Sequence, residues 1–294
     1  MAEVLLGEAL GASGFTRLVA IKRPLLSFRD DDELTRLLIA EARLGARIHH
    51  RNLVSVHDLG LHEGTYYVVM DYVDGADLGS LRRTISPGAE LAVYVVSEVL
   101  LGLHHLHCLA DQHGRPLGLV HRDVSPSNVL VSSSGEVKLA DYGIVKATRL
   151  AGNTAVNVRR GKFAYMSPEQ VAGEPLDARC DLFSVMVMLV ELLTGARPFD
   201  GEGPAEVLER IREAASPDLQ AVPAALRAVV RQGLSGFPGD RHTDALTLRR
   251  ALLDAYPAAR NLGPPELSRW VAGSEGEDSP ASGPSPSQST VYDP

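Results

Sequence analysis

The chain has 294 residues, of which 45% are hydrophobic and 22% are charged, values typical of a globular protein with one large or two smaller domains. The formal net charge of −8 argues against a nucleic acid as the main partner. The longest apolar run, residues 182–193, is too short to cross a bilayer, so we expect no membrane span, no signal peptide and a cytoplasmic location.

The first part of the chain is rich in predicted strands. Short runs of β-branched and other apolar residues predict strands over residues 4–6, 18–22, 53–56 and 66–70. Residues 31–48 begin with acidic residues and continue with apolar residues close to helical spacing, which predicts a helix. Gly11 and Gly14 lie between the first two strands, and we interpret them as turn residues and not as a phosphate-binding loop.

The chain changes character at Asp74-Gly75, and from there on it is predicted to be mostly helical. The expected helices comprise residues 90–108, 177–194, 205–215, 224–234 and 243–256. The change predicts two lobes, residues 1–73 and 74–261, and an α+β fold class. Residues 262–294 are rich in Pro, Ser, Gly and acidic residues, so we expect a disordered tail there.

The cysteines and a group of histidines have simple structural interpretations. Cys108 and Cys180 lie far apart in apolar contexts, so we expect two buried free thiols and not a disulfide or a metal pair. His104, His105 and His107 fall at the end of a predicted helix, where histidine is common. We therefore interpret them as helix-end side chains and not as metal ligands.

A tight polar loop at residues 121–128 lies between two short apolar stretches. It reads His-Arg-Asp at residues 121–123, and Asn128 follows five positions after Asp123. A carboxylate can accept a proton from a hydroxyl group, and an amide oxygen can bind a cation, which are both requirements of phosphoryl transfer. Taken alone, the segment could also be a plain polar loop between two strands.

Other short motifs surround this loop in a fixed order. They are Val-Ala-Ile-Lys at 19–22, Glu41, Asp-Tyr-Gly at 141–143, Ser-Pro-Glu at 167–169 and Asp181. Each motif is a weak signal, but the ordered set is specific. With these motifs, the sequence resembles the bacterial eukaryotic-like (Hanks-type) serine/threonine protein kinases from about residue 4 to residue 256.

The resemblance implies a bilobal kinase-like fold, with a small β-rich N-lobe and a larger helical C-lobe, and transfer of the ATP γ-phosphate to hydroxyl groups of protein substrates. It implies that Lys22 holds the phosphates of ATP and pairs with Glu41. It makes Asp123 the catalytic base, and it makes Asn128 and Asp141 the ligands of Mg²⁺.

The resemblance also assigns residues to the adenosine part of ATP and to the support of the site. The expected nucleotide contacts, besides Lys22 and Asp141, are Val4, Ala20, the gatekeeper Met70, the hinge residues Asp71 and Val73, the ribose contact Asp77, and Leu130. Asp181 is expected to brace the catalytic loop, and Glu169 to form an ion pair with Arg241.

Residues 141–169 correspond to the activation segment of the family. Thr148 and Thr154 are candidate phosphorylation sites within it, and Arg122 is the expected partner of the phosphate, because its guanidinium offers fork-like donors. We also expect regulatory partners to bind through the C-lobe or the tail.

The N-terminus departs from the family pattern. Kinases carry a glycine-rich loop before the strand that here contains Val4, and Ala2 stands where the last glycine is expected. We therefore expect the first strand and most of the loop to be missing, through natural truncation or a start codon assigned too late. The alternative function is a weakly active or inactive kinase-like scaffold. A small-molecule kinase agrees less well with the long activation segment and with Ser167-Pro168-Glu169.

The catalytic loop departs from the family pattern as well. Most serine/threonine kinases have Lys at the position of Ser125 and Thr at the position of Lys162. The two positions touch in the family's fold, so we predict an exchange in which the Lys162 ammonium replaces the missing one at the transferring phosphate. The alternative is that Lys162 is a solvated lysine beside Arg159 and Arg160. Because both usual markers are absent, the serine/threonine preference rests on the general resemblance.

Overall fold

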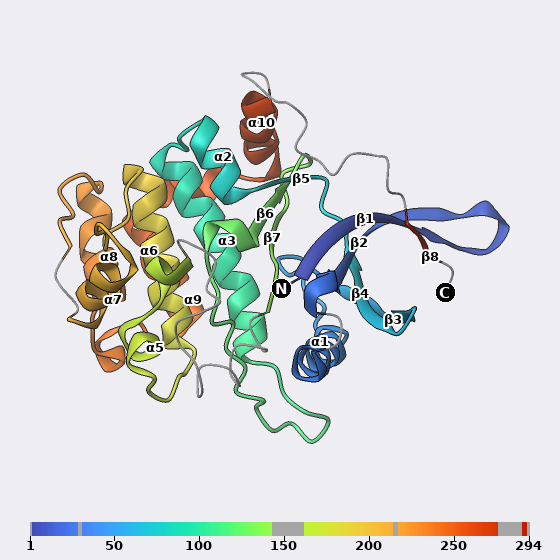
Figure 1. Cartoon of the computed structure of the whole chain (residues 1–294). Helices are drawn as coiled ribbons and strands as arrows, with labels where there is room; N and C mark the ends of the chain where they lie inside the picture. Colours follow the sequence, from blue (N-terminus) through green and yellow to red (C-terminus); the bar gives the residue numbers. More distant parts are fainter. Residues whose placement is uncertain (1, 29–30, 143–161, 214–216, 276–289, 293–294) are drawn as a thin grey trace.

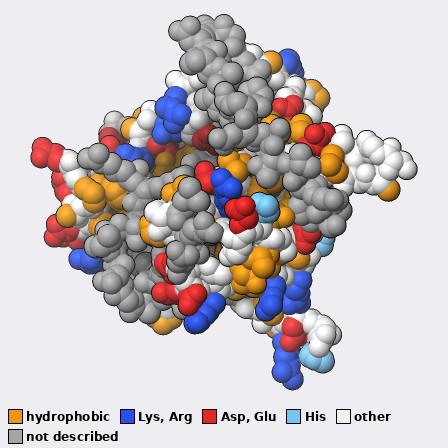
Figure 2. Space-filling model, turned by 45° about the vertical axis from the view of Figure 1, so that its right-hand side comes forward, with side chains coloured by type: hydrophobic (Ala, Val, Ile, Leu, Met, Phe, Trp, Pro, Cys, Tyr) orange, Lys and Arg blue, Asp and Glu red, His pale blue; other side chains and the backbone are white. Residues whose placement is uncertain are grey.

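The computed structural model describes residues 2–28, 31–142, 162–213, 217–275 and 290–292. A small lobe built from a β-sheet and one helix lies beside a larger, mainly helical lobe (Figure 1). The α+β, bilobal kinase-like fold expected from the sequence is therefore confirmed. On the face that Figure 2 shows, acidic and basic side chains are interspersed.

The N-lobe contains one sheet with strand order β3-β4-β2-β1-β8. Its elements are β1 (Ala2–Leu10), β2 (Thr16–Pro24), α1 (Asp32–Gly45), β3 (Val56–His62), β4 (Thr65–Asp71) and, from the far end of the chain, β8 (Thr290–Tyr292). The first four strands pair antiparallel, whereas β8 runs parallel to β1. Gly14 lies in the turn between β1 and β2 with a φ of 77°, which confirms its interpretation as a turn residue.

Helix α1 covers one face of this sheet. The Asp31 side chain accepts a hydrogen bond from the Leu34 N–H and so caps the first turn. Leu38 and Ala42 lie one turn apart on the buried face of the helix and pack against Val68 of β4. The predicted helix is confirmed. Its packing on the sheet fixes the position of Glu41, which lies on the same helix.

The predicted strand at residues 53–56 is wrong, because β3 begins only at Val56. The Val54 N–H donates to the Leu139 carbonyl, and Leu53 bridges to the same residue, so this apolar stretch runs along the C-lobe strand β7. Leu53 and Val54 are buried for that reason and not because they belong to the N-lobe sheet. The residues of β3 are half-buried or exposed, and the chain turns back into β4 at Glu63-Gly64.

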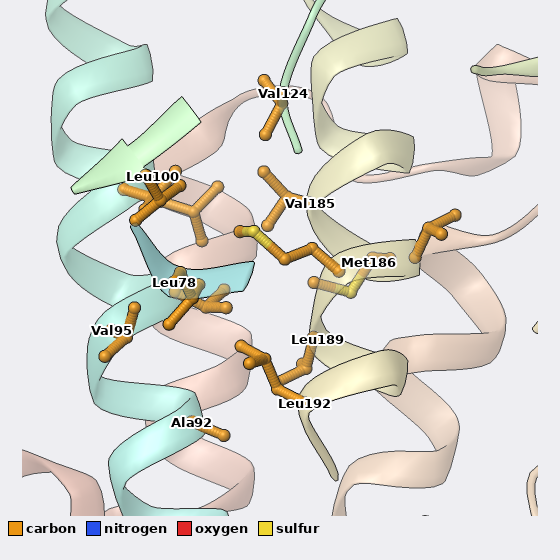
Figure 3. Packing of buried hydrophobic residues seen from close by; sticks show 14 of the residues in the cluster. Leu78, Ala92, Val95, Leu100, Val124, Val185, Met186, Leu189 and Leu192 are labelled. Atoms are coloured by element: carbon orange, nitrogen blue, oxygen red, sulfur yellow. The ribbon is translucent and has the colours of Figure 1, made fainter. Parts of the chain in front are cut away.

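The C-lobe is built around two apolar helices, α3 (Ala89–His107) and α6 (Arg179–Thr194). Its other elements are β5 (Gly75–Asp77), α2 (Leu78–Thr84), β6 (Val129–Ser132), β7 (Val137–Leu139), α5 (Pro168–Ala172), α7 (Pro204–Arg212), α8 (Arg227–Gly233), α9 (Ala245–Ala255) and α10 (Pro264–Glu275). Figure 3 shows Leu100 of α3 and Val185, Met186 and Leu189 of α6 in one buried cluster. By length and composition α3 alone among the described helices could cross a membrane, but here it is a core helix and most of it is buried.

The expectation of a disordered tail from residue 262 is wrong for residues 264–275, which form α10. Leu267, Trp270 and Val271 follow helical spacing and are buried against the C-lobe. The Trp270 Nε1–H donates to the Ile85 carbonyl at 3.2 Å. Three apolar residues are enough to dock the helix, although the segment as a whole is polar.

The two cysteines differ in their surroundings. Cys180 is buried as expected, whereas Cys108 is exposed, so the expectation of two buried thiols is half wrong. Cys108 caps the C-terminal end of α3, where the helix emerges from the core, and its Sγ contacts the His104 ring. Both thiols are free.

Two histidines stack where the loop after α1 meets the end of α3. The rings of His50 and His105 are 5.0 Å apart and nearly parallel, and Nε2 of His105 is buried without a hydrogen-bond partner among the described residues. Burial and the neighbouring cations lower the pKa of both rings. The titratable and charged groups around them are His49, Arg51, Glu98 and His104. The fold thus favours neutral rings.

We expect this pair to make the free energy of unfolding fall as the pH decreases below about 6.5, the ordinary pKa of histidine. The pKa values of the two rings are lowered in the folded state, so the unfolded chain binds protons at a higher pH than the folded chain. Each decrease in pH through this window therefore stabilises the unfolded state relative to the folded state. Urea unfolding between pH 8 and pH 5 should show a smaller decrease in the free energy of unfolding for His105→Gln than for the native chain. The exposed His113→Gln serves as the control, and an unchanged slope for His105→Gln would contradict the expectation.

Candidate active site

A lysine and two carboxylates from three parts of the chain meet beside the sheet. Lys22 Nζ, on β2, lies 2.9 Å from Oε1 of Glu41 on α1 and 2.7 Å from Oδ1 of Asp141. Burial opposes the charge of Lys22, but the two carboxylates outweigh it and raise its pKa. Burial also opposes ionisation of Asp141, yet Lys22 holds the pKa of this carboxyl below its usual range. Lys22 and Asp141 are therefore both charged at neutral pH.

A buried aspartate braces the catalytic loop. Asp181, in the first turn of α6, accepts hydrogen bonds from the backbone N–H groups of His121 and Arg122, each at 2.8 Å. It also lies 2.8 Å from His107 Nε2, and although burial opposes its charge, the bond from His107 lowers its pKa. Arg122 has a φ of 64°, a left-handed conformation that non-glycine residues rarely adopt, and these bonds hold it there. Asp181 thus makes the contacts expected of it, and the His107 contact was not foreseen.

Asp123 and Asn128 are joined within the loop. The Asn128 amide, in the 3₁₀ turn η3 (Pro126–Asn128), donates to the Asp123 backbone carbonyl at 2.7 Å and to its Oδ2 at 3.0 Å. Because the amide hydrogens point toward Asp123, the side-chain oxygen of Asn128 is left as an acceptor or a cation ligand. The structure therefore brings together the two loop residues that the sequence singles out.

Lys162 reaches this pair from the 3₁₀ turn η5 (Lys162–Tyr165). Its Nζ lies 3.0 Å from Oδ2 of Asp123 and 2.9 Å from Oδ1 of Asn128. Ser125 is buried, and its hydroxyl contacts the Ser127 hydroxyl at 3.1 Å. Lys162 thus reaches the loop that contains Ser125, as expected, but its ammonium contacts Asp123 and Asn128.

The N-lobe residues expected at the nucleotide share one face of the sheet. Val4 on β1 is the register partner of Lys22, and Ala20 on β2 is the partner of Met70 on β4. Because side chains alternate along a strand, Ala20 and Lys22 project to the same side, and their register partners project with them. Val4, Ala20 and Met70 therefore provide apolar side chains on the face of the sheet that carries Lys22.

The hinge begins with an aspartate that links the lobes. The Asp71 carboxylate accepts a hydrogen bond from the Ser55 N–H at 3.1 Å and lies 2.8 Å from His57 Nε2. It is also 3.5 Å from Lys138 Nζ, on the C-lobe strand β7. The Asp71 N–H also donates to the Ser55 carbonyl at 2.9 Å. These contacts fix the start of the hinge, which continues to Val73.

Asp77 and Leu130 face each other across the short C-lobe sheet of β5 and β6. The Asp77 carboxylate also caps α2, since it accepts from the Ser80 N–H at 3.0 Å and from the Ser80 hydroxyl at 2.6 Å. The structure thus places the expected ribose contact beside the expected floor of the adenine site, and the cap holds the carboxylate in place.

Tyr142 stands where the family motif has Phe. Its ring is buried and meets His121 edge-on at 6.1 Å, and its hydroxyl donates to the Val54 carbonyl. Burial raises the pKa of this hydroxyl, so it stays protonated. The extra oxygen is therefore satisfied by the backbone that runs between the lobes, which explains why tyrosine fits here.

The end of the activation segment is anchored to the C-lobe. Glu169, on α5, forms a two-pronged ion pair with Arg241 at 2.7 and 2.8 Å, as expected from the sequence. Gln170 Nε2 donates to the Arg122 carbonyl at 3.1 Å and so ties the same helix to the catalytic loop. Thr148 and Thr154 lie outside the described residues.

A second buried carboxylate near this anchor was not foreseen. Glu191, on α6, is 2.8 Å from Arg82 of α2 and 4.0 Å from Arg197, and it accepts the Tyr165 hydroxyl at 2.5 Å. Its three partners are spread over more than a hundred positions of sequence, and no local pattern connects them. The network fixes η5, which carries Lys162, to the helical core.

The oxygen atoms at the centre of the site suit a hard divalent cation. Oδ1 of Asn128 and Oδ1 of Asp141 each already lie within 3 Å of a lysine ammonium, at 2.9 and 2.7 Å. Carboxylate and amide oxygens are the protein ligands that Mg²⁺ prefers. The residues present therefore fit the metal that the family resemblance implies.

A two-lobed fold with a Lys-Glu-Asp bridge beside a braced His-Arg-Asp loop defines a kinase domain. The chain belongs to the protein kinase family, whose domain matches residues 12–260. The chain is 27% identical to the PknI kinase domain of Mycobacterium tuberculosis, with a TM-score of 0.64 over 87% of this chain and 91% of that one.

The curated relatives are bacterial kinases. Tyrosine-protein kinase MasK of Myxococcus xanthus is 38% identical over 86% of this chain and 40% of its own length. Serine/threonine-protein kinase PknL of M. tuberculosis is 36% identical over 85% and 61%. Serine/threonine-protein kinase PrkC of Bacillus subtilis is 30% identical over 88% and 39%. The resemblance to the Hanks-type kinases is confirmed, and the chain spans less than two thirds of the length of these relatives.

Proposed function

We propose that this chain is an ATP-dependent protein kinase domain that transfers the γ-phosphate to hydroxyl groups of protein substrates. The observation that carries the proposal is the bridge from Lys22 to Glu41 and Asp141, together with the Asp123–Asn128–Lys162 cluster. A kinase-like scaffold has no physical need for all of these groups in contact with one another. The anchored end of the activation segment supports protein substrates, because this segment is expected to form the platform on which a protein substrate binds.

Each residue has a role that follows from its position. Lys22, fixed by Glu41, binds the α- and β-phosphates of ATP. Asp123 orients the substrate hydroxyl and accepts its proton. Asn128 and Asp141 hold Mg²⁺, which neutralises charge on the phosphates when it is bound.

Lys162 takes the place of the lysine that the catalytic loop lacks at Ser125. Its ammonium already lies against Asp123, the group beside which the substrate hydroxyl must come. From there it stabilises the negative charge on the phosphoryl group during transfer. Because Lys162 belongs to the activation segment, the charge is in place only when the end of that segment is docked.

We propose serine and threonine as the acceptors, supported by the names of PknL and PrkC. Tyrosine is the second candidate, because MasK, at 38% identity, is named a tyrosine kinase. The two candidates differ in the length of the side chain that must reach Asp123 and in the hydroxyl group, which is a phenol in tyrosine.

Asp123→Asn is expected to lower phosphate transfer by about 10²–10⁴-fold, because an amide cannot accept the proton. The measurement is transfer of radiolabelled phosphate to peptide libraries that contain serine, threonine or tyrosine as the sole acceptor. It gives both the decrease in the transfer rate and the preferred acceptor residue. Asp218→Asn, in a loop remote from the site, is the control and should leave the rate unchanged. No phosphate transfer by either the native chain or Asp123→Asn, with ATP bound by both, would favour the scaffold.

A further inference from the structure

A cavity of about 420 Å³ lies in the C-lobe, apart from every residue assigned to the nucleotide or to catalysis. It opens where α3 and α9 pack side by side, next to the 3₁₀ turn η8 (Pro257–Asn261) (Figure 1). Leu253 and Ala259 are buried and form apolar parts of its wall. The volume lies within the range of about 300–1,000 Å³ that is usual for small-ligand sites.

Three arginines line this cavity: Arg249, Arg250 and Arg260. The Arg249 Nε–H donates to the Ser97 carbonyl at 3.2 Å, which fixes the side chain and leaves its terminal nitrogens to a ligand. Arg260 pairs with Asp254, outside the lining. Within the part of the chain that the structure describes, the Arg250 guanidinium makes no hydrogen bond or ion pair. Positive charge is thus concentrated here in a chain of net charge −8.

The wall adds a neutral donor to these cations. The Tyr94 hydroxyl, on α3, has no hydrogen-bond partner among the described residues, and burial together with Glu98 raises the pKa of this group. It therefore stays protonated and can donate. No lining residue of the described cavity is acidic, so an anionic ligand meets no carboxylate on its walls.

We propose that this cavity binds a phosphate monoester whose organic part is apolar. Guanidinium groups bind phosphate oxygens with paired hydrogen bonds, and Arg250 is free to do so without breaking another contact. The organic part packs on Leu253 and Ala259, and Tyr94 donates to a remaining oxygen. A phosphorylated protein side chain and a free phosphorylated metabolite present the same chemistry. The proposal does not depend on the kinase reaction, since the cavity shares no residue with that site.

The test is calorimetric titration of the full chain with phenyl phosphate, in the presence of Mg²⁺ and a non-hydrolysable ATP analogue that fills the nucleotide site. We expect one binding event, at least tenfold weaker in Arg250→Gln and weaker still in Arg250→Gln/Arg260→Gln. Arg212→Gln, at the exposed end of α7, is the matched control and should bind like the native chain. Arg250 makes no polar contact with the other residues that the structure describes, so the single variant is expected to fold.

Benzyl alcohol and a phosphotyrosine peptide complete the experiment. Benzyl alcohol should not bind, because it lacks the phosphate. Tighter binding of the peptide than of phenyl phosphate identifies a phosphorylated side chain as the source, and equal or weaker binding identifies a free ester. No heat with phenyl phosphate, or equal affinity in the native chain and both arginine variants, overturns the proposal.

Discussion

Lys162→Met is expected to lower kcat for phosphate transfer by about 10²–10³-fold, the usual effect of removing one preorganised electrostatic donor from a transition state. Methionine keeps the length of the side chain but removes the ammonium that lies 3.0 Å from Asp123 and 2.9 Å from Asn128. Steady-state kinetics with a peptide identified by library screening give kcat directly. A kcat equal to that of the native chain would sink the assigned role.

The double variant Ser125→Lys/Lys162→Thr supplies the matched control. It restores both residues that the family carries at these positions, so the ammonium enters from the catalytic loop and not from η5. We expect its kcat to lie within about tenfold of the native value, whereas Lys162→Thr alone should lose as much as Lys162→Met. A double variant as slow as the single one would mean that the two positions do not replace each other.

The location of the positive charge has a consequence for control of the reaction. A lysine in the catalytic loop stays near the phosphate whatever the activation segment does. Lys162 is positioned instead by η5, whose Tyr165 is held by Glu191 and by a hydrogen bond from the Ser184 hydroxyl to its carbonyl at 2.7 Å. The proposed role of Lys162 would couple catalysis to docking of the segment through one side chain, and a partner that displaces η5 would then also remove the charge.

The centre of the site could be predicted from the sequence because each motif fixes its own local geometry. A lysine that ends an apolar strand, a glutamate inside a helix and an aspartate after a strand project predictably once the fold is recognised. Two coordinated departures from the family pattern, at Ser125 and Lys162, even brought Lys162 to the catalytic loop, although its contacts with Asp123 and Asn128 were not foreseen. The roles of these groups in transfer remain predictions.

Contacts between distant segments could not be predicted in this way. The buried Glu191 carboxylate is paired with Arg82 and Tyr165, which lie far from it in sequence. The arginine-lined cavity forms only where α3 packs against α9. The apolar residues Leu53 and Val54 suggested a strand of the N-lobe sheet, but they are buried along the C-lobe strand β7. In each case, the contact is made with a segment that is distant in sequence, so no local pattern could reveal it.

The most instructive error concerns α10, where composition outweighed three well-spaced apolar residues. The helix lies beyond the matched kinase domain, which ends at residue 260, yet it packs on α2 and β6. The Ser268 hydroxyl donates to the Ser133 carbonyl at 2.7 Å, and the Ser133 N–H donates to the Asp74 carbonyl at 2.6 Å, just after the hinge. The helix therefore supports the strand pair that presents Asp77.

Trp270→Ala is accordingly expected to lower the free energy of unfolding by about 3–5 kcal/mol, the usual cost of removing a buried aromatic side chain. It also leaves the Ile85 carbonyl without its donor. Urea unfolding of the native chain and the variant measures the difference, and Arg269→Ala, whose side chain is 75% exposed, should change it by less than about 0.5 kcal/mol. If α10 were dispensable, both variants would unfold like the native chain. A loss confined to Trp270→Ala would show that the folded domain draws stability from a segment beyond residue 260, where the matched family domain ends.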